Sequence, residues 1–302
     1  MKSPHVFIII VNWNGYKDTL DCLKSLHEIT YKNYTIIIID NGSTDNSINI
    51  LRSTYPDIKI LENSKNLGYT GGVNTGIKYA MQQNADYVLL LNNDTVVRSN
   101  FLQPLIDYVL KENNVGIVGS RINYFNNKDL TQSLGGSFSY YSSYPLKLLS
   151  HKQLSTYKDK PSDVDWVSGC SMLIRNSLLQ KLIGLDDDYF LYVEDADICM
   201  RAGKLEYKVV IVPDSIVWHK TKSSTGGEDS VVYDYYNSRN LLLFANKHLK
   251  KIDKFLYTIN ILRSRLLEIL SLIRTRKKKR ATAMIRGLLH GLLNIKGYYS
   301  KI

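Results

Sequence analysis

Three carboxylates lie within four residues of one another in the segment Phe190–Arg201. Glu194, Asp195 and Asp197 have apolar neighbours, and clustered carboxylates raise one another's pKa. A carboxylate with a raised pKa suits a general base that takes a proton from a hydroxyl group. The alternative is an acidic helix start in which Asp197 pairs with Arg201 one turn later. We favour a catalytic role for this cluster of Glu194, Asp195 and Asp197, because unpaired acid clusters beside buried aromatic residues are costly unless they are used.

A second group of candidates comes directly after the apolar run Tyr87–Leu91. Hard divalent cations such as Mg²⁺ take oxygen ligands and keep several waters, so Asp94 and the oxygens of a diphosphate can hold one. His219 is a further candidate ligand, since neutral imidazole commonly binds metals, although a lone histidine is more often structural. Turn chemistry alone also explains the polar residues Asn92 and Asn93.

The segment Asp40–Asp45, which reads Asp-Asn-Gly-Ser-Thr-Asp, follows another apolar run. A carboxylate at a strand end can accept the imide N–H of a uracil or thymine ring, while backbone amides and small side chains accommodate a ribose. The alternative is a helix start capped by Ser43 or Thr44. Both interpretations fit this segment. The candidate nucleotide-binding residues here are Asn12, Asn14, Asp40, Asn41, Gly42 and Ser43.

The segment Asn66–Asn74 contains Gly68, Gly71 and Gly72. Glycines allow a backbone to approach a ligand closely, and the helix that follows offers free N–H groups to a phosphate. A plain tight turn explains Gly71 and Gly72 equally well, but it does not explain the flanking Asn66 and Asn74. We therefore favour a phosphate-binding function for the segment Asn66–Asn74 over a plain turn.

Alternating apolar runs and helix-like stretches predict the elements that position these residues. Polar loops follow the expected strands, and open α/β sheets bind ligands at the carboxyl ends of their strands. We therefore expect an α/β fold with a mostly parallel sheet, in which residues 1–120 bind a nucleotide. The expected strands are Val6–Val11, Thr35–Asp40, Ile58–Leu61, Tyr87–Leu91 and Val115–Val118, and the expected helices are Tyr16–Ile29, Asn46–Thr54, Gly72–Asn84 and Asn100–Glu112.

Residues 121–240 form the second half of the expected domain. The regular pattern breaks from about Arg121 to Asp165, where Leu134–Tyr141 is expected to form a hairpin within an acceptor-side insertion. Regular structure is expected to resume with the segment Trp166–Arg175, a short helix near Asn176–Ile183, and a strand at Lys208–Val212.

Charge is distributed unevenly along the 302 residues, whose net charge is +11. Residues 241–302 carry 15 Lys or Arg against two Asp or Glu, which leaves the preceding 240 residues nearly neutral. A basic, Leu/Ile-rich tail on a neutral body indicates anionic lipid as the partner rather than nucleic acid. Three widely spaced cysteines and the absence of a recognisable secretion signal lead us to expect a cytoplasmic protein.

The basic tail at 241–302 also has helical apolar periodicity. Its apolar runs are shorter than the roughly 20 residues needed to cross a bilayer, so we expect amphipathic helices that lie on a membrane surface. The alternative is packing on the protein's own core or on a second subunit. The expected apolar face is Phe255, Ile259, Leu262, Leu266, Ile269 and Ile273, and the basic cluster is Arg274, Arg276, Lys277, Lys278, Lys279 and Arg280.

In combination, these segments resemble family 2 glycosyltransferases of the GT-A fold, especially the rhamnosyltransferase-like branch. The ordered set covers residues 6 to 240 and is much more specific than any one motif. It consists of VNWNG, IIIDNGSTD, NLGYTGGVN, LLLNNDTVV, DWVSGCSMLIR, FLYVEDADICMR, a following WH, and YYNSRN at Tyr235–Asn240.

The resemblance implies an inverting sugar transfer from a dTDP- or UDP-sugar to a glycan or lipid-linked acceptor at the inner face of the cell membrane. Asp40 would recognise the base, with Asn12 lining the nucleotide pocket. Asn92 and Asn93 would border this nucleotide-sugar pocket, and the sugar-nucleotide loop would include Asn66, Gly68 and Asn74. Asp94, with His219, would bind Mg²⁺ or Mn²⁺, and Asp195 would be the catalytic base. Trp166, Ser168 and Gly169 would face the acceptor.

One departure from the family pattern concerns the metal site, because many relatives have two aspartates where this chain reads Asn92-Asn93-Asp94. The rhamnosyltransferase-like branch commonly reads Asn-Asn-Asp there. A nucleotidyltransferase is the competing enzyme class, but it would usually show a basic Gly-rich triphosphate loop near the N-terminus. A non-catalytic lipid- or glycan-binding descendant of such an enzyme is the other alternative.

Overall fold

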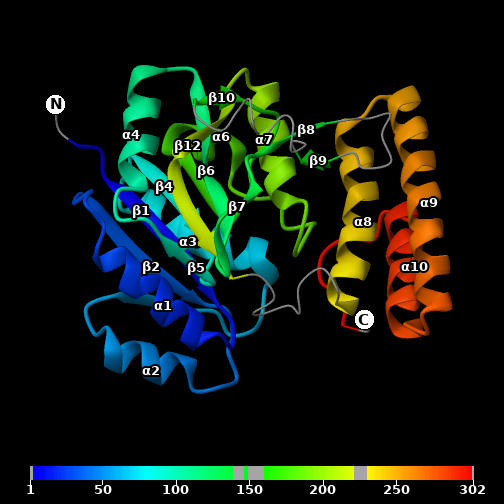
Figure 1. Ribbon diagram of the computed structural model, residues 1–302, viewed down its shortest axis with the longest axis horizontal. Coiled ribbons are helices and arrows are strands. Elements are labelled where there is room, and N and C mark those ends of the chain that lie inside the picture. Colours follow the sequence, from blue (N-terminus) through cyan, green and yellow to red (C-terminus); the bar gives the residue numbers. More distant parts are fainter. Residues whose placement is uncertain (1–2, 139–145, 149–159, 221–229, 301–302) are drawn as a thin grey trace.

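The computed structural model describes residues 3–138, 146–148, 160–220 and 230–300. Figure 1 shows an α/β body, built around one twisted sheet, beside a layer of three long C-terminal helices. Its strands are β1 (Val6–Asn12), β2 (Tyr34–Asp40), β3 (Lys59–Glu62), β4 (Tyr87–Leu91), β5 (Thr95–Val97), β6 (Val115–Tyr124), β7 (Asn127–Ser133), β10 (Ser162–Asp163), β11 (Ser171–Arg175) and β12 (Lys208–His219), with β8 (Gly136–Phe138) and β9 (Leu146–Leu148) as a separate pair.

The main sheet has the strand order β10-β12-β6-β11-β4-β1-β2-β3, with β5 beside β12 and β7 beside β6. Strands β1, β2, β3 and β4 form parallel pairs, and β6 is parallel to β12. Strand β11 is antiparallel to both β4 and β6. The predicted α/β sheet is therefore confirmed as a mixed sheet. Its half formed by β1 to β4 is parallel, whereas β11 at its centre and the pairings of β5, β7 and β10 are antiparallel.

Helices cover both faces of this sheet, as the side-chain alternation along β1 shows. Ile8 and Ile10 belong to one core with residues of α1, α2 and α4, whereas Phe7 and Ile9 belong to the other with residues of α3, α6, α7 and α8. The helices are α1 (Tyr16–His27), α2 (Ser47–Thr54), α3 (Gly68–Gln82), α4 (Leu102–Lys111), α6 (Asn176–Leu182), α7 (Glu194–Lys204), α8 (Val231–His248), α9 (Lys251–Arg274) and α10 (Lys278–Leu292).

Strand directions bring the candidate residues to one edge of the sheet. Asn12 lies opposite Asp40 in the in-register pair of β1 and β2. Ser171 at the start of β11 lies opposite Leu91 at the end of β4, so the segment before Ser171 reaches the same edge. Strand β12, which runs parallel to β6, ends at His219 beside Thr95.

The expected elements of the first 120 residues all form, with ends shifted by a few residues. Helix α3 begins earlier than expected, at Gly68. The regular structure expected to stop near Arg121 instead continues, since β6 extends to Tyr124. The strand expected at Lys208–Val212 also extends further, because β12 ends at His219. The hairpin expected within 134–141 is wrong, because its residues 136–138 form β8 and pair with β9, at 146–148. Residues 139–141 lie outside the described ranges.

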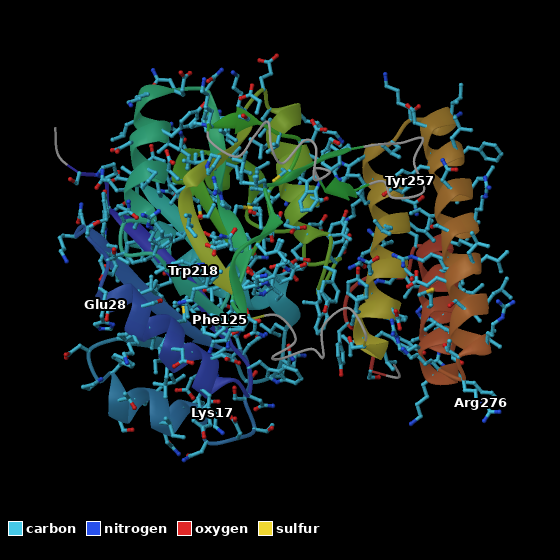
Figure 2. The ribbon with its side chains drawn as sticks, viewed as in Figure 1. Lys17, Glu28, Phe125, Trp218, Tyr257 and Arg276 are labelled. Carbon is cyan, nitrogen blue, oxygen red and sulfur yellow. The ribbon has the colours of Figure 1, made fainter. Side chains whose placement is uncertain are left out.

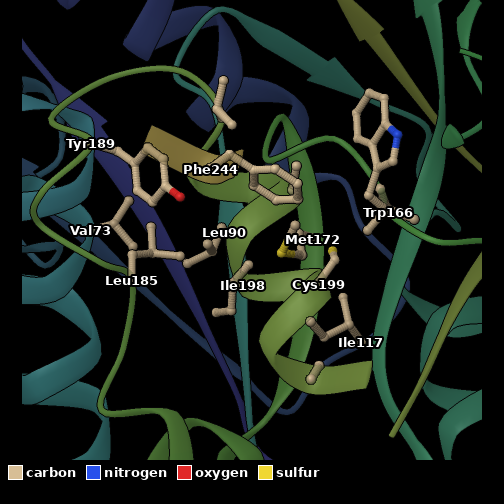
Figure 3. Close-up of a cluster of buried hydrophobic side chains, with 14 of the residues drawn as sticks. Val73, Leu90, Ile117, Trp166, Met172, Leu185, Tyr189, Ile198, Cys199 and Phe244 are labelled. Carbon is tan, nitrogen blue, oxygen red and sulfur yellow. The ribbon is translucent and has the colours of Figure 1, made fainter. Parts of the chain in front are cut away.

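The C-terminal helices belong partly to the protein's own core. The expected domain boundary at residue 240 falls inside helix α8. Phe244 of this helix packs beside Met172, Ile198 and Cys199 (Figure 3). Helix α10 packs closely on α8, where Gly287 approaches the carbonyl of Tyr235. Among the described residues, no helix has both the length and the apolar character needed to cross a bilayer.

The apolar face expected on α9 divides between two environments. Ile269 is buried and Leu262 packs against the core, but Phe255 is 64% exposed and Leu266 is 56% exposed. The buried face of α9 is instead Tyr257, Ile261, Ile269 and Leu272. A second, exposed stripe on α9 consists of Ile252, Phe255, Ile259, Leu266, Leu270 and Ile273.

Candidate active site

Asp195 lies in the first turn of α7, where the positive end of the helix dipole favours an anionic side chain. Its Oδ2 accepts a hydrogen bond from the backbone N–H of Gly169 at 3.1 Å, and its Oδ1 accepts one from that of Ala196 at 2.8 Å. Burial raises the pKa of Asp195, although these two N–H groups act in the opposite direction. The side chain remains partly exposed and can therefore reach a ligand.

Glu194 is the more deeply buried member of this acidic pair, with 7% of its surface exposed. Burial, followed by the charge of Asp195, raises the pKa of Glu194 from 4.5 to about 8. Its Oε2 has no hydrogen-bond partner among the described residues. Two adjacent carboxyl groups with raised pKa values are therefore present, as the sequence predicted.

Asp197 has a different role, because its carboxylate is fully buried and bound on several sides. It accepts hydrogen bonds from Arg201 Nε at 2.6 Å and from Tyr189 Oη at 3.0 Å, and His248 Nε2 lies 2.7 Å from its Oδ1. Burial alone would raise the pKa of Asp197, but His248 and Arg201 hold it below its ordinary value. The alternative interpretation, an Asp197–Arg201 pair one turn apart, is confirmed for this residue.

Asp94 and His219 are brought together at the carboxyl edge of the sheet. Strand β5 pairs with β12, and Oδ1 of Asp94 lies 3.2 Å from Nε2 of His219. On the other side of the imidazole ring, Nδ1 lies 3.1 Å from Oε1 of Gln132. Sequence reasoning missed Gln132, whose only signal was its place in the irregular segment. Within the described ranges, no group of three or more His, Cys, Asp or Glu side chains could hold a metal.

Asn93 holds neighbouring elements together. Its Nδ2 donates to Thr19 Oγ1 at 3.1 Å, and Thr19 Oγ1 in turn donates to Asn12 Oδ1 at 2.8 Å. These buried contacts join the end of β4 to α1 and to the end of β1. Thr19 was missed by sequence reasoning because it reads as an ordinary helix residue. The backbone N–H of Asn92 bonds to the carbonyl of Cys170, which ties β4 to the segment beside Asp195.

Asp40 lies beneath the expected nucleotide pocket and is 1% exposed. Its Oδ1 accepts hydrogen bonds from Asn12 Nδ2 at 2.9 Å and Ser43 Oγ at 2.7 Å, while its Oδ2 accepts one from the Ser43 N–H at 2.9 Å. Asp40 therefore fixes the loop that follows β2. Recognition of a base by Asp40 stays a prediction.

The rim of this pocket is ordered by two asparagines. Oδ1 of Asn14 accepts a hydrogen bond from the Thr44 N–H at 2.8 Å, which links the loops after β1 and β2. Asn41 is 2% exposed, and its Nδ2 donates to Asn66 Oδ1 at 3.1 Å. Gly42 has a φ of +72°, and a Cβ there would meet the backbone of Lys65 at 2.5 Å, so only glycine fits.

The segment 66–74 differs from the expected phosphate loop. Asn66 Oδ1 accepts a hydrogen bond from the Gly68 N–H at 2.8 Å and so fixes the turn that leads into α3. Gly72 lies inside α3, where a Cβ would be 2.9 Å from Val11, so it serves helix–sheet packing. Asn74 Nδ2 donates to the carbonyl of Leu185 at 2.9 Å, and Asn74 therefore holds the loop before α7. The expected helix start at Gly72 is wrong, because α3 already begins at Gly68.

The expected acceptor residues meet Asp195 through Gly169. Tyr69, which sequence reasoning did not single out, donates from its hydroxyl to the Gly169 carbonyl at 3.0 Å. Ser168 is partly exposed beside them, with its Oγ accepting the Cys170 N–H at 3.2 Å. Trp166 is 8% exposed and belongs to the larger core (Figure 3), so its ring does not form an open surface in this conformation.

Comparison with known proteins gives a family match over more than half of the chain. The family model described as Glycosyl transferase family 2 matches residues 7–183. This range includes the loops after β1, β2 and β4, together with the segment around Gly169. It ends before Asp195 and His219, so the roles of these two residues depend on the geometry above.

Two curated relatives match most of the chain. An N-acetylglucosaminyl-diphospho-decaprenol L-rhamnosyltransferase from Mycobacterium tuberculosis is 25% identical over 245 residues, which cover 75% of this chain and 79% of the relative. The low-salt glycan biosynthesis hexosyltransferase Agl10 from Haloferax volcanii is 27% identical over 297 residues, which cover 96% of this chain and 92% of the relative.

Solved structures show the same architecture. The mannosyltransferase PcManGT from Pyrobaculum calidifontis, in complex with GDP-Man and Mn²⁺, aligns with a TM-score of 0.61 at 14% identity and covers 97% of this chain and 88% of that one. At this level of identity the likeness shows the fold alone. It confirms the GT-A fold predicted from the sequence.

Proposed function

The chain belongs to glycosyl transferase family 2, and from that premise we propose that it is an inverting transferase of the rhamnosyltransferase-like branch. It would move rhamnose or a hexose from a dTDP- or UDP-sugar to a hydroxyl of a cell-surface glycan or a lipid-linked intermediate. The observation that carries this proposal is the position of Asp195, which is held by Gly169 beside the loop after β4.

Inversion requires one displacement and one base. Asp195 would accept the proton of the acceptor hydroxyl as that oxygen attacks the anomeric carbon from the face opposite the nucleotide. The bond between the anomeric carbon and the diphosphate breaks, and its electron pair leaves with the nucleoside diphosphate. The partial exposure of Asp195 and its raised pKa support this role.

Asp94 and His219 fit a divalent cation. If Nδ1 of His219 donates to Gln132, its Nε2 carries the lone pair that a metal ligand needs, on the side of the carboxylate of Asp94, so these two residues would hold the cation. Donor oxygens and waters would complete the coordination. A bound Mg²⁺ or Mn²⁺ would neutralise the charge that develops on the diphosphate.

The C-terminal helices would hold the enzyme at the inner face of the cell membrane, where a lipid-linked acceptor resides. The exposed stripe on α9 supports this proposal, because its six apolar side chains face outward at spacings of three, four or seven residues. The basic cluster begins at the last residue of α9 and continues into the first turn of α10, and Arg276 lies at the outer end of the helical layer (Figure 2). Arg280 also pairs with Asp234, so it serves the fold as well.

A donor screen tests the proposed activity. Release of nucleoside diphosphate is measured from dTDP-L-rhamnose, UDP-glucose and UDP-galactose, with and without Mg²⁺ or Mn²⁺. We expect one donor to be used strongly in the presence of metal and a lipid-linked glycan. Transfer of a nucleotidyl group, or binding of donors without turnover of any of them, would contradict the proposal.

A further inference from the structure

The loop that leads into the catalytic helix has an unfavourable backbone. Phe190, Tyr192 and Val193 have φ values of 64°, 67° and 73°, and none of them is glycine. Positive φ is uncommon outside glycine and is a genuine outlier for a β-branched residue such as Val193. Such a conformation persists only where the surroundings impose it. Because Glu194 and Asp195 follow directly, whatever holds this loop also places the proposed base.

Asn240 of α8 holds the loop by its backbone. Its side chain is fully buried, and its Nδ2 lies 3.0 Å from the carbonyl oxygen of Tyr189, 2.7 Å from that of Leu191 and 2.8 Å from that of Tyr192. These three carbonyls span the strained part of the loop. An asparagine amide at this position therefore supplies the donors that the irregular backbone lacks.

Arg239 extends the same contact. Arg239 is fully buried, and its Nη2 donates to the carbonyls of Tyr189 at 2.8 Å and Asp188 at 3.2 Å. Its Nε donates to Asn240 Oδ1 at 2.8 Å. Its Nη1 donates to the carbonyl of Gly297, in the segment after α10. A buried guanidinium is costly unless its donors are satisfied, so this arrangement joins the loop, α8 and the C-terminal segment.

The opposite side of the loop contacts the helix of the expected sugar-nucleotide segment. The Thr70 N–H of α3 donates to the Phe190 carbonyl at 3.3 Å, and a Cβ at Gly68 would lie 2.4 Å from the Phe190 ring. The loop is therefore enclosed between α3 and α8. A shift of its backbone would move Asp195 relative to α3.

We propose that Arg239 and Asn240 are positioning residues that hold the loop 188–193 so that Asp195 meets the acceptor hydroxyl in reactive geometry. This inference rests on the proposed role of Asp195 as the base. It gives the helices α8 and α10 a part in catalysis that is separate from any contact with a membrane.

The test is Asn240→Asp, which keeps the shape of the side chain but turns an oxygen toward the three carbonyls. Ser238→Ala is the matched control, because Ser238 is buried on the same helix and its Oγ has no hydrogen-bond partner among the described residues. Release of nucleoside diphosphate from dTDP-L-rhamnose and UDP-glucose gives kcat and donor KM, with water or a lipid-linked glycan as the acceptor. Hydrogen exchange of the loop 188–193 is measured in parallel.

We expect kcat of Asn240→Asp to fall about 100-fold, because misplacement by about 1 Å from a distant change has an effect of that size. Donor KM should stay within about threefold, and exchange should rise in the loop but not in β1 or β2. Ser238→Ala should match the wild type in all three measurements. Arg239→Lys, which keeps the charge but loses the planar fork, should lower kcat in the same way.

The outcomes separate this inference from the proposed function. If Asp195→Asn retains full transfer, the proposed base is wrong. If Asp195→Asn is inactive while folded Asn240→Asp and Arg239→Lys have wild-type kcat, the positioning role is overturned. Unchanged exchange in the loop of Asn240→Asp also overturns it, whatever the activity. Arg239→Lys decides the question by the same measurements if Asn240→Asp does not fold.

Discussion

Nε2 of His219 lies 3.2 Å from Oδ1 of Asp94, although the two residues come from distant parts of the chain. Strand β12 brings them together by pairing with β5 and continuing past the point where its apolar pattern ends. Gln132, on β7, contacts the other nitrogen of the imidazole ring. The proposed metal site therefore includes a supporting residue as well as its two proposed ligands.

Replacing Gln132 with leucine tests that support. Loss of a residue that orients a ligating histidine typically lowers metal affinity about 10- to 100-fold. We expect Gln132→Leu to raise the Mg²⁺ or Mn²⁺ concentration for half-maximal activity by about that factor, while saturating metal restores most of kcat. Gln82→Leu, at an exposed position of α3, is the control. Full activity of the wild type in excess chelator would show that the reaction needs no divalent cation.

The raised pKa of Glu194 predicts a pH-dependent stability. The Glu194 carboxyl keeps its proton up to about pH 8 in the folded state, but loses it near pH 4.5 in the unfolded chain. The free energy of unfolding therefore falls as pH rises through this range. The wild type should lose stability relative to Glu194→Gln between pH 5 and 8. Urea unfolding of both proteins across this range measures the difference. A constant difference would mean that Glu194 does not titrate there.

Asp197 should affect stability rather than chemistry. Removing one partner of a buried ion pair typically costs about 3–5 kcal/mol, and Asp197→Asn removes the anionic partner of Arg201 and His248. We expect its urea midpoint to fall accordingly, whereas Asp57→Asn at an exposed position should have little effect. An unchanged midpoint for Asp197→Asn would show that this buried network does not stabilise the fold.

The basic cluster should drive binding to anionic lipid. Each Lys or Arg near such a surface contributes about 1 kcal/mol. The pair Lys278→Ala and Lys279→Ala should therefore weaken binding to phosphatidylcholine vesicles containing phosphatidylglycerol by about 10- to 30-fold. The pair Lys17→Ala and Lys24→Ala, exposed on α1, is the control. Co-sedimentation that is equal for both pairs would contradict the membrane proposal.

Much of the fold could be predicted because the apolar runs are long and regular. Strand β4 begins and ends where the pattern Tyr87–Leu91 predicts. Strands β6 and β12 extend further because they pair with each other again beyond the irregularity between Val212 and Ile216, where polar residues interrupt the apolar pattern of β12. Nothing in the sequence of β11 indicates that this strand runs antiparallel to its neighbours β4 and β6.

The candidate site was predicted in part. The acidic pair and the polar strand ends could be found because each combines charged or amide groups with an apolar run. The Asp197–Arg201 pair could also be found, because the two residues are one helical turn apart. The contacts of Asn74 with Leu185 and of Asp197 with His248 could not, because these partners lie far along the chain. The motif containing Arg239 was visible, but only the folded chain shows that it contacts the loop before Asp195.

Single-turnover sugar transfer by Asp195→Asn shows directly whether this carboxylate is the base, with nucleoside diphosphate affinity measured in the same preparation. Loss of a general base typically lowers the rate about 10²- to 10⁴-fold. We predict a loss of that size with nucleotide affinity unchanged, because the proposed nucleotide pocket lies in the loops after β1 and β2. A folded Asp195→Asn protein that transfers sugar at the wild-type rate would contradict the account.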